Sequence, residues 1–124
     1  MSTPPRILDV GQCGIDGPRL RRLLTTELHA TVDRADTKTQ ALAFAAKHAY
    51  SLVLVNRILN ADRSPGLDII AALKTSHPDL KTMLVSDQPD AQQQAAALGA
   101  LPGFGKSNLE SEDTVNLLRN ALSP

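Results

Sequence analysis

Short apolar segments alternate along the chain with segments in which apolar residues recur every three or four positions. The apolar segments predict five β-strands, at 7–10, 30–33, 51–56, 81–86 and 101–104. The periodic segments predict five helices, at 18–28, 37–49, 65–77, 89–98 and 111–122. Because strand and helix alternate five times, the pattern predicts an α/β fold with a parallel sheet covered by helices on both faces.

The segment 51–56 is the clearest strand. Its run Leu-Val-Leu-Val is unbroken by polar residues, which is typical of a strand buried on both faces of a parallel sheet. Helix starts are marked by Pro18, with Asp16 or Gly17 as the cap, and by Thr37 followed by Gln40, which resembles a capping box.

In open parallel sheets the functional crevice lies beyond the carboxyl ends of the strands. Four stretches fall at these ends in the predicted fold. They are Gly11–Gln12, Asn56–Arg57, Ser86–Asp87 and 103–106. The chemistry of these residues should therefore decide what the protein can do.

Length and composition limit the alternatives. The chain of 124 residues has room for a single domain, 1–124, in which we expect residues 1–5 to be a flexible N-terminus. Lys plus Arg and Asp plus Glu number 13 each, so no basic excess points to nucleic acid. One cysteine, Cys13, fits a reducing compartment, and no apolar run is long enough to span a membrane. We therefore expect a cytoplasmic protein.

At the strand ends the sequence resembles the receiver domain of two-component response regulators, over nearly its whole length. Residues 7–12 resemble the first strand with its acidic pair, and 52–56 the third strand with its phosphoacceptor. Residues 64–70 resemble the Pro-Gly entry into the third helix, while 84–86 and Lys106 match the positions of the conserved Ser/Thr and Lys. The resemblance implies a flavodoxin-like, CheY-like fold with strand order 2-1-3-4-5.

The departures from the family are at the phosphorylation site itself. Gly11 and Gln12 stand where the family has two carboxylates, and Asn56 stands where it has the acceptor aspartate. Mg²⁺ prefers negatively charged oxygen ligands, and the Asn amide is no nucleophile. We therefore expect no Mg²⁺ or other metal, no cofactor and no enzymatic activity, which makes the chain a degenerate receiver or pseudo-receiver.

Ser86 and Lys106 remain at family positions. Gly103 occupies the place of the family's switch aromatic, and Phe104, one residue later, should face the other side of the sheet. We expect Lys106, without its usual carboxylates, to pair with Asp9 or Asp87; the alternative is a partly hydrated Asp9 capped by backbone donors.

These observations favour a signalling module that binds a protein partner, or a second copy of itself, without phosphorylation. Two alternatives stay open. One is a phosphorelay receiver with an unorthodox acceptor. The other is a flavodoxin-like domain that binds a small ligand or nucleotide in the crevice emptied of carboxylates. Residues 100–107 nearly fit a phosphate-binding loop, but a helix precedes them and no later strand could supply its carboxylate, so we expect a glycine-rich strand and turn there.

Overall fold

The computed structural model describes residues 4–123 and has the predicted fold class. Its five strands are β1 (Arg6–Val10), β2 (Thr31–Ala35), β3 (Leu52–Asn56), β4 (Thr82–Val85) and β5 (Leu101–Phe104). They form one parallel sheet in the order β2-β1-β3-β4-β5. The helices are α1 (Asp16–Leu28), α2 (Lys38–Lys47), α3 (Gly66–Ser76), α4 (Pro89–Ala97) and α5 (Glu112–Leu122).

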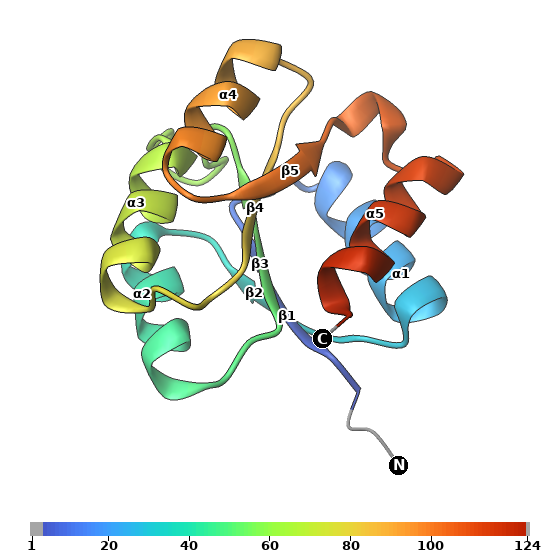
Figure 1. The fold of residues 1–124 in the computed structure, drawn as a ribbon, viewed down its shortest axis with the longest axis horizontal. Helices are drawn as coiled ribbons and strands as arrows, with labels where there is room; N and C mark the ends of the chain where they lie inside the picture. Colours follow the sequence, from blue (N-terminus) through green and yellow to red (C-terminus); the bar gives the residue numbers. More distant parts are fainter. Residues whose placement is uncertain (1–3, 124) are drawn as a thin grey trace.

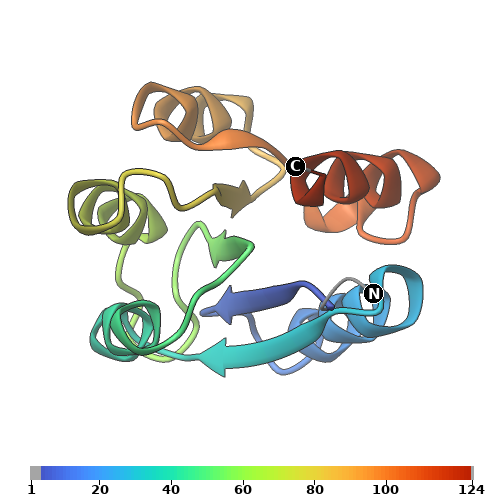
Figure 2. The same ribbon diagram turned by 60° about the horizontal axis from the view of Figure 1, so that its bottom comes forward.

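The sheet separates two layers of helices. Figure 1 shows α1 and α5 on one face and α2, α3 and α4 on the other, and Figure 2 shows the same three layers from a turned view. Each face has its own apolar core, because successive residues of a strand point to opposite sides. In β3, for example, Val53 and Val55 join the core under α2 and α3, whereas Leu52 and Leu54 join the core under α1 and α5.

Side-chain caps mark the starts of α2 and α5. The side chain of Thr37 accepts a hydrogen bond from the Gln40 amide at 3.2 Å, as the capping pattern predicts. Ser111 caps α5 in the same way through the Thr114 amide. Helix α1 differs from the prediction, since it begins at Asp16, two residues before Pro18, with Ile15 as its N-cap residue.

Strand β5 is irregular. Met83 pairs with Leu101 and Val85 with Phe104, so β5 carries one extra residue between two pairs and forms a bulge. The chain then makes a short 3₁₀ turn over Lys106–Asn108, which the sequence pattern did not indicate. These two features set the position of Lys106 above the sheet edge.

Residues 1–3 and 124 lie outside the described residues, and the N-terminus expected to be flexible, 1–5, falls partly on them. The carbonyl oxygen of Pro5 accepts a hydrogen bond from the Thr31 amide at 2.8 Å. Among the described helices, none is long and apolar enough to cross a bilayer.

Candidate functional site

The carboxyl ends of β1, β3, β4 and β5 meet at one edge of the sheet and surround a hollow of about 360 Å³. Its lining residues are Cys13, Asn56, Arg57, Ile58, Asn60, Arg63, Val85, Ser86, Asp87, Gln88 and Lys106. The structure thus brings together Asn56, Ser86, Asp87 and Lys106. A larger, open hollow of about 1000 Å³ lies at the opposite, amino-terminal edge, away from these residues.

Gly11 has the conformation and the surroundings of a position that excludes a side chain. Its φ is +77°, a region that L-residues rarely adopt. A Cβ atom placed there would lie 2.5 Å from Cγ of Leu59, which is fully buried. The space of the first expected carboxylate is therefore filled by an apolar side chain from the loop after β3.

Gln12, at the second acidic position, turns under α1. Its side chain is buried, and its Cβ atom lies 3.3 Å from where a Cβ atom on Gly17 of α1 would be. Neither of its amide atoms makes a hydrogen bond to another described residue. Gln12 is not among the residues that line the hollow.

Asn56 serves a structural purpose at the phosphoacceptor position. Its side chain is 5% exposed, and its Nδ2 atom donates to the carbonyl oxygen of Gly11 at 2.9 Å. The same carbonyl accepts from the Asn60 amide at 3.0 Å. The amide of Asn56 consequently joins the end of β3 to the end of β1, a bond that an ionised aspartate has no proton to make.

Asp9 lies deeper in β1 and is 1% exposed. Its Oδ2 atom is 3.1 Å from Nη1 of Arg21 on α1, while Oδ1 makes no hydrogen bond within residues 4–123. Burial raises the pKa of Asp9 to about 6, although the Arg21 guanidinium lowers it in part. Arg21 of α1 therefore reaches inward to this buried carboxylate.

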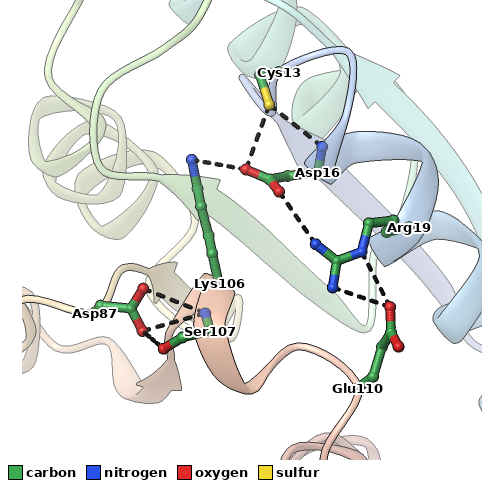
Figure 3. A network of polar contacts seen from close by, with 7 residues as sticks. All are labelled: Cys13, Asp16, Arg19, Asp87, Lys106, Ser107 and Glu110. Carbon is green, nitrogen blue, oxygen red and sulfur yellow. Dashed lines mark hydrogen bonds and ion pairs between the residues drawn. The ribbon is translucent and has the colours of Figure 1, made fainter.

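The pairing expected for Lys106 with Asp9 or Asp87 is wrong. Its Nζ atom lies 3.3 Å from Oδ2 of Asp16, at the start of α1. Figure 3 shows the Lys106 side chain crossing the sheet edge toward Asp16, which also lies beside Cys13 and Arg19. Asp9 is neither partly hydrated nor paired with lysine, because α1 brings Arg21 closer to it.

Asp87 points to the turn after β5 instead. Its carboxylate accepts from the backbone amide and the hydroxyl of Ser107, the latter at 2.6 Å. Ser86, 7% exposed, accepts from the Gln88 amide at 3.1 Å. Both residues thus organise the loops that surround the hollow.

The place of the switch aromatic is covered by Gln92 of α4. Its Nε2 atom donates to the carbonyl oxygens of Leu84 and Ser86 at 2.9 and 3.0 Å, and its Oε1 atom accepts from the Gly103 amide at 3.2 Å. A Cβ atom on Gly103 would lie 2.1 Å from the Leu84 carbonyl oxygen. Phe104 is buried on the other face of the sheet, in the core that includes Leu118.

Sequence reasoning missed four participants: Asp16, Arg21, Leu59 and Gln92. The only signals in the sequence were the glycines at 11 and 103, where the lack of a side chain leaves space for a neighbouring residue. Which residue fills it depends on how a distant loop or helix packs, and a single sequence does not show that.

Mg²⁺, the metal that the receiver fold implies, does not fit this site. Magnesium is usually held by one or two carboxylates in octahedral geometry. At the three family positions this chain has a glycine, a buried amide and an amide bonded to the backbone. Within residues 4–123 no three His, Cys, Asp or Glu side chains gather closely enough to hold a metal ion.

No family model matches the sequence, and no curated protein does. Among solved structures, the signal receiver domain of an HD-domain-containing protein from Pseudomonas fluorescens is 26% identical, with a TM-score of 0.83, and the alignment covers 98% of this chain and 90% of that one.

Two further structures are similar. A CheY-like receiver domain protein from Methanospirillum hungatei is 20% identical with a TM-score of 0.81, covering 97% of this chain and 94% of that one. NtrX from Brucella abortus is 22% identical with a TM-score of 0.78, covering 95% of this chain. This chain spans 27% of the length of that NtrX chain. The fold is that of CheY-like response regulator receiver domains.

Proposed function

We propose that this receiver-like chain acts in signal transduction as a protein-interaction module that works without phosphorylation. The observation that carries the proposal is the state of the acceptor position. The Asn56 amide is buried and bonded to Gly11, and the space beside Gly11 is filled by Leu59. The acceptor position therefore has no nucleophile that could form an aspartyl phosphate, and the space for the carboxylates that would bind its metal ion is filled.

The second support is the attachment of α4. In a receiver that is switched by phosphorylation, the surface formed by α4, β5 and α5 changes when the acceptor is phosphorylated. Here Gln92 joins α4 to both β4 and β5 through three hydrogen bonds. We infer that this face is presented in one arrangement.

The same face has hollows that would receive side chains of a partner. Two hollows of about 260 and 360 Å³ lie along β5 and α5, and Leu117 lines both. A protein partner, or a second copy of the chain, would place side chains there.

The test of phosphorylation independence is incubation with acetyl phosphate and Mg²⁺, followed by intact mass spectrometry, which reports covalent phosphorylation alone. We expect no mass increase of one phosphoryl group. A receiver domain that carries all three carboxylates, treated in the same tube, shows that the donor is active. A phosphoryl adduct on this chain would overturn the proposal and support the phosphorelay alternative, and peptide mapping would then locate the acceptor.

The α4–β5–α5 face is tested through self-association. Sedimentation velocity of the wild type and of Leu117→Arg compares the chain with and without the shared wall of the two hollows. If the second copy is the partner, the wild type dimerises and Leu117→Arg is monomeric, whereas Asn116→Arg on an exposed position of the same helix still dimerises. A wild type that stays monomeric excludes the homodimer and leaves a different protein as the partner.

A further inference from the structure

The hollow at the carboxyl edge is lined mainly by positive charges, whereas a metal site requires negatively charged ligands. Three of its lining residues are cations, Arg57, Arg63 and Lys106, and only Asp87 is an anion. Lys106 is paired with Asp16, and Asp87 is bonded to Ser107. Within the described residues neither arginine makes an ion pair, so their two charges remain available to the hollow.

The loop that carries both arginines is held closed by its own backbone. The Gly66 amide donates to the Arg57 carbonyl at 2.7 Å, and the Arg63 amide donates to the Leu59 carbonyl at 2.8 Å. Ile58 and Pro65 form an antiparallel bridge across the loop, and the buried side chain of Leu59 fixes it to the sheet. A loop so ordered loses little conformational freedom on binding a ligand.

The floor of the hollow adds a neutral donor. The Ser86 hydroxyl accepts from the Gln88 amide, which leaves its own proton able to donate. One N–H of the Asn56 amide donates to the Gly11 carbonyl, which leaves its second N–H as a further donor at the floor. The donors of the hollow therefore include one hydroxyl, one amide, one ammonium group and two guanidinium groups.

We propose that this hollow binds a small phosphate-class oxyanion non-covalently and without a metal, with Arg57 and Arg63 as its main ligands. Guanidinium groups present parallel N–H donors that match the oxygens of a phosphate, and several donors around one hollow suit an anion with several oxygens. At about 360 Å³ the hollow is near the lower end of small-molecule sites, which suits inorganic phosphate or a small phosphomonoester. Neither forms a covalent bond to the chain, so this inference and the proposed function can fail separately.

The test is an amide NMR titration at low ionic strength, with EDTA present, using inorganic phosphate in one arm and glycerol 3-phosphate in the other. Sodium chloride at matched ionic strength serves as the reference. We expect saturable shifts at Arg57, Arg63 and Ser86, with dissociation constants in the millimolar range or tighter. Saturation by both ligands means that the phosphate group alone is recognised, and saturation by the ester alone means that the rest of the hollow contributes; both outcomes support the proposal.

The variant Arg57→Gln/Arg63→Gln should weaken this binding at least about tenfold, because it removes the two unpaired charges. Arg22→Gln removes an exposed charge on α1 outside the hollow and should leave the affinity unchanged. Circular dichroism checks that each variant is folded. Shifts that stay linear in phosphate, or a saturable affinity that the double variant retains, would overturn the proposal.

Discussion

Gly11 explains why a carboxylate cannot simply be restored at this edge of the sheet. Its positive φ and the adjacent Leu59 side chain act together, since any side chain at this position meets both. The loss of the acidic residue is therefore built into the packing of the loop after β3. A reversal would require the loop itself to move.

The first prediction concerns this packing. Gly11→Ala should lower the free energy of unfolding by about 2–4 kcal/mol, because alanine is strained at positive φ and its Cβ atom collides with Leu59. Urea denaturation measures the change. Gly14→Ala, in the same loop but with nothing within 4 Å of the added Cβ atom, should change stability by less than about 1 kcal/mol. Equal effects of the two substitutions would contradict the account.

Asp9 gives a prediction about pH. Its folded pKa is about 6, against 3.8 for a free aspartate, so folding favours the protonated form. Its contribution to stability is complete below about pH 4 and is lost as the pH rises through 6. This direction is opposite to that of a salt-bridged surface carboxylate such as Asp33, whose pKa is lowered because the hydrogen bonds from Tyr50 and Arg6 outweigh the effect of burial.

Asp9→Asn isolates this effect, because asparagine has nearly the same shape and does not titrate. The difference in unfolding free energy between the variant and the wild type should shift in favour of the variant by about 2 kcal/mol between pH 4 and pH 7. Every other titrating group cancels in this difference. A difference that stays constant with pH would mean that Asp9 is ionised throughout, held so by Arg21.

At the scale of elements, a side chain of α4 takes the place of backbone hydrogen bonds between β4 and β5. The bulge in β5 interrupts its pairing with β4, and Gln92 supplies the hydrogen bonds that the strands do not make to each other at this point. The amide therefore carries both the cohesion of the sheet edge and the attachment of the helix. The fixed arrangement of the α4–β5–α5 face depends on this contact.

Gln92→Leu tests it. The substitution leaves two carbonyl groups and the Gly103 amide without their partner, so stability should fall by about 2 kcal/mol. The Gly103 amide should also exchange its hydrogen faster than in the wild type, which NMR measures residue by residue. Gln93→Leu, one position along on the exposed side of α4, should affect neither quantity. Unchanged exchange at Gly103 in Gln92→Leu would show that other contacts hold α4 in place.

Periodicity was enough to predict the elements, because each one has to bury its own apolar face. The unbroken apolar run in 51–56 and the cap at Thr37 are local signals, and the structure agrees with both. The start of α1, the bulge in β5 and the 3₁₀ turn at Lys106 follow from contacts between segments. For the same reason the partner of Lys106 was predicted wrongly: its distance to Asp16 depends on how α1 and the β5 loop sit on the sheet.

At the scale of the whole molecule, the two helical layers share one sheet. The same five strands supply residues to the core under α1 and α5 and to the core under α2, α3 and α4. Neither core can lose its packing without exposing one face of strands such as β3, which is buried throughout. The domain should therefore unfold as one cooperative unit.

The last prediction tests this unity through Tyr50, which is the chain's only tyrosine in a sequence without tryptophan. Tyr50 belongs to the core under α2 and α3, whereas Leu118 is fully buried in the core under α5, across the sheet. Leu118→Ala should lower stability by about 2–5 kcal/mol, and Leu73→Ala, in the core of Tyr50, should lower it by a similar amount. In both variants, tyrosine fluorescence and far-ultraviolet circular dichroism should give the same urea midpoint. If Leu118→Ala lost helical signal before Tyr50 responded, the α1 and α5 layer would unfold by itself, and the face that includes α5 would not be fixed.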